Sequence, residues 1–201
     1  MPQPVAGVLP AVTLVLGGAR SGKSRYAETL VAAAAEAATY GAATYIATAE
    51  PGDAEMAARI AAHRARRGSF WRTVEAPLDL AGAILRHAAP ARPVLVDCLT
   101  LWLSNLMGSR RVVEHEGETL RAALREAAGP VVLVANEVGL GLVPETPLGR
   151  EFRDAAGRLN QDVAALADRV VFVAAGLPLV LKDPPPPARE GARSSPGWGC
   201  R

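Results

Sequence analysis

The stretch GGARSGKS, residues 17–24, decides the fold of this chain. It fits the pattern G-x-x-x-x-G-K-[ST], in which backbone N–H groups of a glycine-rich loop surround phosphates while the lysine and the hydroxyl complete the site. An apolar run, VTLVL at 12–16, precedes it, and an alanine-rich helical pattern at 22–38 follows it. A strand, this loop and a helix in that order predict a site for a nucleoside triphosphate.

Short apolar runs alternate with longer helical patterns along the rest of the chain. The runs lack the polar–apolar alternation of a half-exposed strand, which is typical of parallel strands buried on both faces. We therefore predict a single α/β domain, a mostly parallel sheet with helices on both faces, in which residues 179–181 return as an antiparallel edge strand. The predicted strands are 12–16, 43–47, 93–97, 131–135 and 169–174, and the predicted helices are 22–38, 53–67, 78–89, 98–107, 114–128 and 147–167.

Length and composition limit the possible classes of protein. A chain of 201 residues, half of them hydrophobic, suits one domain at 12–182 between an N-terminal extension at 1–11 and a Pro/Gly/Ser/Arg-rich tail at 183–201, which we expect to be disordered. The net charge of +2, from 22 basic and 20 acidic residues, predicts no bulk attraction for nucleic acid. Two cysteines, Cys98 and Cys200, make no disulfide framework, and no apolar run approaches the roughly 18 residues of a membrane span. We expect a cytoplasmic protein.

Polar and glycine residues follow the predicted strands. Thr48 follows the second strand, Asp97 ends the third, Asn136 follows the fourth and Gly176 follows the fifth. Because ligands of open α/β sheets bind at the carboxyl ends of the strands, we expect the site at this edge. Asp97 suits a Mg²⁺ site together with Ser24, and its alternative role is to cap the helix that follows it.

The segment DAEMAARIAAHRARRGSFWRTVEAP, residues 53–77, places a histidine on a basic helix. Helical spacing puts His63 on one stripe with Met56 and Ile60, so a partly buried histidine beside solvated arginines is one interpretation. The other is a nucleophile that attacks the α-phosphate of a nucleotide while the arginines hold the departing pyrophosphate. Glu75 suits hydrogen bonds from a base or ribose, or else is a surface carboxylate in a turn.

A third segment, ANEVGLGLVPETPLGREFRDAAGRLNQ at 135–161, begins at a strand end. Its glycines and prolines indicate a shaped binding loop rather than a tight turn. The arginines of the following helix, Arg150, Arg153 and Arg158, are expected to form a solvated face paired with acidic neighbours.

Together these stretches resemble the bifunctional cobinamide kinase and cobinamide-phosphate guanylyltransferase family of adenosylcobalamin biosynthesis. The resemblance covers residues 12–182 and rests on LVLGGARSGKSRYAE, D-x-E-M-x-x-R-I-x-x-H-R followed by W-R-T-V-E, VDCLTLWLSN and NEVGLGLVPETPLGREFRDAAGRLNQ. It implies a RecA-like phosphate-loop fold, a homotrimer, and an enzyme that phosphorylates adenosylcobinamide with ATP or GTP and then transfers GMP from GTP to that phosphate.

The resemblance also implies site residues. The GMP group passes through His63, and Lys23 acts on the phosphates. The nucleotide is held by Gly17, Gly18, Ala19, Arg20, Ser21, Gly22, Lys23 and Ser24, by Ala47, Thr48 and Ala49, by Arg64, Ala65, Arg66 and Arg67, and by Glu75 and Asp97.

This chain departs from some relatives at Ala61 and Ala62, where they have a second histidine or polar residue, so it has no spare nucleophile. Two rival functions remain. A monofunctional small-molecule kinase needs Lys23, Ser24 and Asp97 but not His63. A nucleotide-binding switch protein binds GTP or ATP with no covalent adduct.

Overall fold

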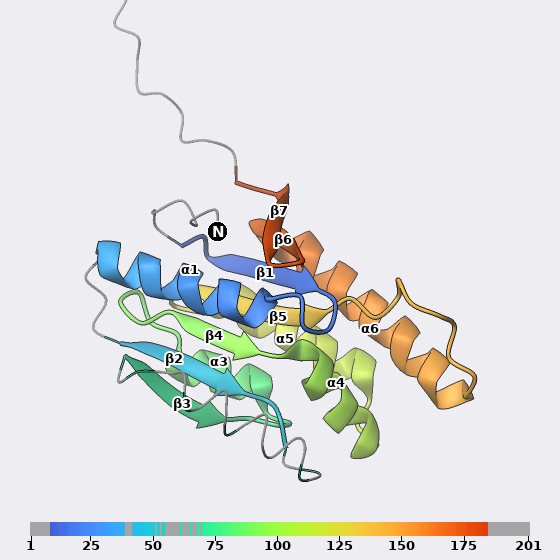
Figure 1. Ribbon diagram of the computed structural model, residues 1–201. Coiled ribbons are helices and arrows are strands. Elements are labelled where there is room, and N and C mark those ends of the chain that lie inside the picture. Colours follow the sequence, from blue (N-terminus) through green and yellow to red (C-terminus); the bar gives the residue numbers. More distant parts are fainter. Residues whose placement is uncertain are drawn as a thin grey trace, which may run out of the picture.

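The computed structural model describes residues 9–38, 42–50, 52, 54, 61, 65, 68 and 70–184. In these residues the chain forms a seven-stranded sheet in the order β3-β2-β4-β5-β1-β6-β7 (Figure 1). Six strands run parallel, and β7 pairs antiparallel with β6. The strands are β1 Val12–Gly17, β2 Ala43–Ala47, β3 Trp71–Glu75, β4 Val94–Asp97, β5 Val131–Asn136, β6 Arg169–Ala174 and β7 Leu177–Lys182.

Helices cover both faces of the sheet, as predicted. Among the described helices, α1 lies on one face, and α3, α4, α5 and α6 lie on the other (Figure 1). The α/β class, the mostly parallel sheet and the antiparallel edge strand are thereby confirmed. The helices are α1 Lys23–Ala38, α3 Leu80–His87, α4 Leu99–Gly108, α5 Val113–Glu126 and α6 Pro147–Leu166. Most of the predicted helix at 53–67 lies outside the described residues.

Alternate strand residues supply the two cores. In β5, Val131, Leu133 and Ala135 pack toward α3–α6, whereas Val132 and Val134 pack toward α1. The central strands are buried on both faces, which explains their continuous apolar sequences. Leu9, within the expected N-terminal extension, is also buried and belongs to the core on the α1 face. Residues 1–8 and 185–201 lie outside the described part of the chain.

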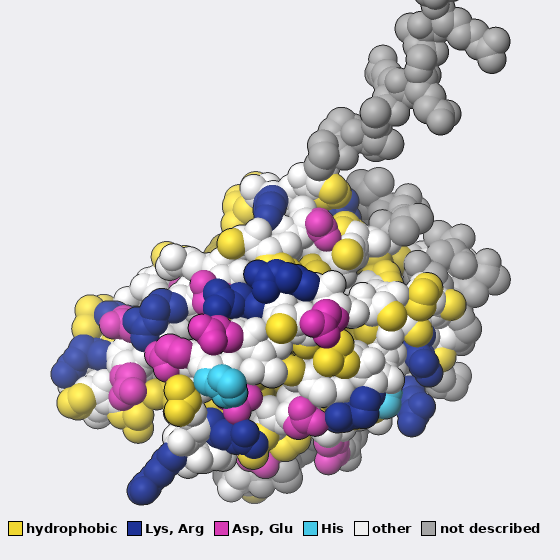
Figure 2. Space-filling model, turned by 180° about the vertical axis from the view of Figure 1, so that it is seen from behind, with side chains coloured by type: hydrophobic (Ala, Val, Ile, Leu, Met, Phe, Trp, Pro, Cys, Tyr) yellow, Lys and Arg dark blue, Asp and Glu magenta, His cyan; other side chains and the backbone are white. Residues whose placement is uncertain are grey.

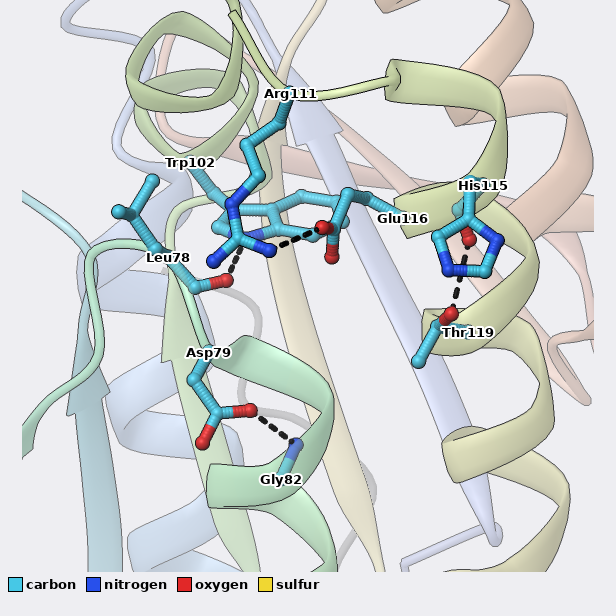
Figure 3. Close-up of polar contacts among 8 residues, drawn as sticks. All are labelled: Leu78, Asp79, Gly82, Trp102, Arg111, His115, Glu116 and Thr119. Carbon is cyan, nitrogen blue, oxygen red and sulfur yellow. Dashed lines mark hydrogen bonds and ion pairs between the residues drawn. The ribbon is translucent and has the colours of Figure 1, made fainter. Parts of the chain in front are cut away.

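Local capping and packing fix the helices on the α3–α6 face. Asp79 caps α3 by accepting a hydrogen bond from Gly82 N at 3.0 Å (Figure 3). The buried indole of Trp102, on α4, donates from Nε1 to the Leu78 carbonyl at 2.9 Å, so this large side chain leaves no unsatisfied donor in the core. On the face of the molecule seen in Figure 2, basic and acidic side chains are interspersed rather than gathered by sign.

One strand differs from the sequence prediction. Residues Trp71–Glu75 form β3, a parallel edge strand on β2, where no strand was predicted. Its second and third residues, Arg72 and Thr73, are exposed, so the segment lacks the continuous apolar run that marks the inner strands. Glu75 therefore ends a strand, and the alternative of a turn residue is wrong. Within the described residues no helix is long and apolar enough to cross a membrane.

Candidate nucleotide-binding and catalytic site

The loop after β1 has the backbone conformation that its glycines predict. Gly22 has φ +96°, in the left-handed region that favours glycine. A Cβ on Gly17 would lie 2.5 Å from the Val173 carbonyl oxygen and 2.6 Å from Ser21 Oγ, so glycine is required there as well. Gly176, after β6, donates from its N–H to the Ser21 carbonyl at 2.8 Å. The loop is thus held against the end of the neighbouring strand.

Lys23 begins α1 and is the buried cation of this loop. Its side chain is only 9% exposed, and Nζ donates to the Gly18 carbonyl at 3.0 Å. The ammonium group therefore lies against the loop that the motif assigns to phosphates. Ser24 follows it in the first turn of α1, where the helix presents its partial positive charge and unpaired N–H groups. This combination of fixed positive groups suits the β- and γ-phosphates of a nucleotide.

Register places three strand ends in a row beside the loop. Gly17 pairs with Asn136 across β1 and β5, and Asp97 pairs with Val134 across β4 and β5. Because successive side chains alternate between faces, Asp97 follows Leu95, and Asn136 follows Val134, on the face that α1 covers. The predicted meeting of strand-end residues at one edge is therefore observed.

Asp97 is oriented by a side chain far away in sequence. The hydroxyl of Tyr45, on β2, donates to Asp97 Oδ2 at 2.8 Å. The alternative role of helix cap is wrong, because the residue at the N-cap of α4 is Cys98, which makes no side-chain capping bond. The Asp97 carboxylate faces the carboxyl edge of the sheet, and the hydrogen bond from Tyr45 on β2 fixes its orientation.

The segment Ala47, Thr48 and Ala49 ends β2 at the same edge. Thr48 is fully buried, and its hydroxyl donates to the Cys98 carbonyl at 2.7 Å and accepts from Cys98 N at 2.8 Å. Asn105, on α4, donates to the carbonyls of Thr48 at 2.8 Å and Pro77 at 3.1 Å. Both hydrogen bonds of the Thr48 hydroxyl thus join the ends of β2 and β4. The backbone of this segment and the half-buried Ala47 and Ala49 remain to contact a ligand.

Glu75 lies at this edge but far from the phosphate loop. It pairs with Ala47, is exposed, and ends the outermost parallel strand. Four strand spacings of about 4.8 Å separate β3 from β1, so the backbones of Glu75 and Gly17 lie roughly 19 Å apart. That separation suits contact with the base or ribose and excludes contact with the phosphates near Gly17.

Several predicted site residues cannot be placed. His63, Arg64, Arg66 and Arg67 lie outside the described residues, whereas Ala65, the remaining member of the predicted 64–67 group, is described and exposed. The described part of the chain contains no group of three or more His, Cys, Asp or Glu side chains that suits a metal ion. Mg²⁺ does not need such a cage, since it is usually bound by one or two protein oxygens together with phosphates and water. A carboxylate and a hydroxyl, from Asp97 and Ser24, fit that pattern.

Cys98 and the other two histidines take no part in this site. Burial, and then the nearby Asp97 carboxylate, raise the pKa of the Cys98 thiol to about 11, so the thiol is protonated and not nucleophilic at neutral pH. His87 ends α3, which leads to the amino end of β4, at the opposite edge. Burial and the neighbouring Arg72, Arg86 and Arg92 lower its pKa. His115 is exposed on α5, on the face opposite α1 (Figure 3).

The loop between β5 and α6 begins beside the phosphate loop. Glu137 N donates to the Gly17 carbonyl at 3.1 Å. Farther along, Leu140 and Leu142 are 81% and 96% exposed. Arg150 is exposed, as expected, but it donates to the carbonyls of Pro144 and Glu145 at 3.0 and 2.8 Å in place of the expected pairing with an acidic side chain.

The prediction is confirmed for Arg153, which pairs with its neighbour Asp154 at 3.3 Å. Such a pair contributes little to stability and needs no functional explanation. Arg158 is exposed, as expected.

Sequence reasoning missed the residues that orient the site. Tyr45 gave no signal, because an aromatic residue in a buried strand is ordinary. Asn105 gave a weak one, as one of the few polar residues in the apolar helix LTLWLSNLMG. Thr100, whose Oγ1 accepts from Asn136 N at 2.7 Å, and Asn160, whose Nδ2 donates to the Asn136 carbonyl at 3.2 Å, hold the end of β5.

Comparison with known sequences places the chain in a functional context. The family model described as "Cobinamide kinase / cobinamide phosphate guanyltransferase" matches residues 13–181. The bifunctional adenosylcobalamin biosynthesis protein CobP of Pseudomonas aeruginosa is 51% identical over 174 residues, which cover 86% of this chain and 98% of the relative. The bifunctional adenosylcobalamin biosynthesis protein CobU of Salmonella typhimurium is 41% identical over 184 residues, which cover 84% and 98% respectively.

Comparison with solved structures supports the fold. The flagellar accessory protein FlaH of Methanocaldococcus jannaschii superposes with a TM-score of 0.51 at 10% identity, over 92% of this chain and 86% of that one. At such low identity the likeness concerns the fold alone.

Proposed function

Because the chain belongs to the cobinamide kinase / cobinamide phosphate guanyltransferase family, we propose that it first phosphorylates the aminopropanol hydroxyl of adenosylcobinamide and then transfers GMP from GTP onto that phosphate. At the coarser level the chain is a bifunctional cobinamide kinase and guanyltransferase of adenosylcobalamin biosynthesis. The observation that supports a nucleotide-dependent reaction is the buried Lys23 in a glycine loop beside Asp97 and Asn136.

The first reaction uses the phosphate loop. Backbone N–H groups of residues 17–24 and the Lys23 ammonium bind the β- and γ-phosphates, which neutralises the charge on the transferred group. Ser24 and Asp97 hold Mg²⁺ when it is bound, and the ion adds positive charge at the phosphate oxygens. The Tyr45 hydroxyl keeps the Asp97 carboxylate turned toward this position.

The second reaction uses His63. An imidazole nitrogen of His63 bonds to the α-phosphorus of GTP, the bond to the bridging oxygen breaks, and pyrophosphate leaves with that electron pair. A phosphate oxygen of adenosylcobinamide phosphate then attacks the same phosphorus and displaces the imidazole. Arg64, Arg66 and Arg67 bind the departing pyrophosphate, and Glu75, about 19 Å from Gly17, binds the base or ribose.

Product analysis tests this order of reactions. The full chain is incubated with adenosylcobinamide, Mg²⁺ and ATP, and the corrinoid is followed by mass spectrometry before and after GTP is added. We expect the corrinoid to gain one phosphate with ATP alone and a GMP group once GTP is present. A corrinoid that stops at the phosphate supports the monofunctional kinase. Nucleotide binding with an unmodified corrinoid supports the switch protein.

We further propose that the chain assembles as a homotrimer, as its family resemblance implies. An apolar surface on β7 supports self-association: Leu177, Leu179, Val180 and Leu181 are each 50 to 60% exposed on an edge strand. An apolar edge of this kind pairs readily with other chains unless it is covered.

Light scattering tests the assembly. We expect the wild type to have the mass of three chains, and the double variant Leu179→Lys and Leu181→Lys to have a lower mass, because two charges enter the apolar contact. Leu85→Lys, at an exposed leucine of α3, is the matched control and should leave the mass unchanged. A wild type with the mass of one chain contradicts the trimer, and an unchanged double variant contradicts the role of β7.

A further inference from the structure

The side chain of Asn136 contains a polar atom that the fold leaves unsatisfied. Its Oδ1 is buried and has no hydrogen-bond partner in the part of the chain that the structure describes. Buried polar groups in proteins are nearly always hydrogen-bonded, because an unmade bond leaves the cost of removing the group from water uncompensated. An orphan acceptor is therefore a feature that needs a cause.

The backbone of Asn136, in contrast, is fully held. Its N–H donates to Thr100 Oγ1 at 2.7 Å, and its carbonyl accepts from Asn160 Nδ2 at 3.2 Å. These partners come from α4 and α6, on the face opposite α1. Two helices thus fix the end of β5, and the alternation of side chains along the strand places the Asn136 side chain on the α1 face.

The neighbours of Asn136 at this edge are the phosphate loop and the Asp97 carboxylate. Gly17, the first residue of the phosphate loop, is its partner on β1, and Asp97 ends β4 on its other side. The amide therefore lies between the loop that binds phosphates and the carboxylate that faces the same edge. An acceptor oxygen does not bind a phosphate oxygen, because both lack a proton. It requires a donor, and the donor that must come to the γ-phosphate in a kinase reaction is the hydroxyl of the acceptor substrate.

We propose that Asn136 is a positioning residue for phosphoryl transfer, and that its Oδ1 accepts a hydrogen bond from the substrate hydroxyl in front of the γ-phosphate. This inference rests on the proposed kinase activity. In the reaction the hydroxyl oxygen bonds to the γ-phosphorus, the bond from that phosphorus to the β–γ bridging oxygen breaks, and the nucleoside diphosphate leaves with the electron pair. The hydroxyl proton passes to water, since an amide oxygen is too weak a base to take it. Asn136 contributes by alignment alone.

The two activities of the enzyme separate this role from a structural one. Guanylyl transfer onto adenosylcobinamide phosphate involves the α-phosphate and a substrate whose hydroxyl is already phosphorylated. A residue that aligns the hydroxyl affects the kinase reaction and leaves guanylyl transfer unchanged. A residue that merely supports the fold affects both reactions and the thermal stability together.

The experiment compares Asn136→Leu, which removes the acceptor at similar size, with Asn136→Asp, which keeps an acceptor oxygen. In Asn136→Leu we expect kcat of the kinase reaction to fall by about 10- to 100-fold, while KM for the nucleotide changes by less than about threefold. Guanylyl transfer, measured with adenosylcobinamide phosphate as the supplied substrate, should be unchanged. Asn136→Asp should recover part of the loss. Asn160→Ala, which removes an amide bonded to the same backbone carbonyl, is the matched control and should change both activities by the same factor.

Each result has a distinct meaning. The inference is contradicted if both Asn136 variants reduce kinase activity and guanylyl transfer by the same factor. It is also contradicted if kcat of the kinase reaction is unchanged in Asn136→Leu. If Asn136→Leu does not fold, as judged by its melting curve, equal activities of Asn136→Asp and Asn136→Ala contradict it. A wild type that leaves adenosylcobinamide unphosphorylated contradicts the proposed function itself.

Discussion

Replacing Lys23 with alanine is expected to lower kcat/KM of the kinase reaction by about 10³-fold or more. The ammonium group is buried, lies against the Gly18 carbonyl, and is the only lysine in the phosphate loop. A fixed charge in a site shielded from water stabilises the transferred phosphate far more than a solvated one. The measurement is steady-state phosphorylation of adenosylcobinamide together with nucleotide binding.

The chain provides a clean control for this variant. Lys182 is the other lysine of the sequence, and its Nζ donates to the Ala164 and Ala165 carbonyls at the end of α6. Lys182→Ala removes the same side chain and also loses hydrogen bonds to backbone carbonyls, so it measures the structural cost alone. We expect it to keep kinase activity within about threefold of the wild type. A Lys23→Ala enzyme of similar activity would contradict the assignment of the phosphate loop.

The inner strands of the fold were predictable because strands buried on both faces appear in the sequence as runs of apolar residues. The strands around β1 are covered on both faces, so their residues are mostly apolar, and the predicted ranges agree with the observed strands to within one residue. β3 was missed for the opposite reason. As an edge strand with exposed Arg72 and Thr73, it is held by backbone pairing to β2, which the residue types do not record.

The parts of the site also differ in how far they could be predicted from the sequence. The phosphate loop is local, so its spacing alone predicts the conformation that the structure shows at Gly17 and Gly22. The contacts that orient Asp97 and Asn136 join residues between 24 and 52 positions apart. Pairings at such separations depend on strand order and register, which cannot be read from local sequence patterns. The position of His63 stays a prediction, since it lies outside the described residues.

Replacing His63 with alanine is expected to abolish guanylyl transfer, by about 10³-fold or more, while kinase activity stays within about threefold of the wild type. The reason is chemical. In the proposed mechanism the imidazole forms the bond to the α-phosphorus, whereas phosphoryl transfer to a hydroxyl has no step at that atom. With GTP labelled at the α-phosphate, the denatured wild-type protein should carry label that survives base and is lost in acid, as a phosphorus–nitrogen bond predicts.

Two further variants make the result specific to His63. The chain has three histidines, and His87→Ala and His115→Ala remove the other two, one at the opposite edge of the sheet and one exposed on the face opposite α1. Both should keep the label, because His87 lies at the opposite edge of the sheet and His115 lies on the face opposite the phosphate-loop helix α1. Label retained in His63→Ala, or lost in His115→Ala, would place the nucleophile elsewhere. A wild type that binds GTP, phosphorylates adenosylcobinamide and carries no label would mean that GMP passes directly from GTP to the corrinoid phosphate, with no covalent histidine at all.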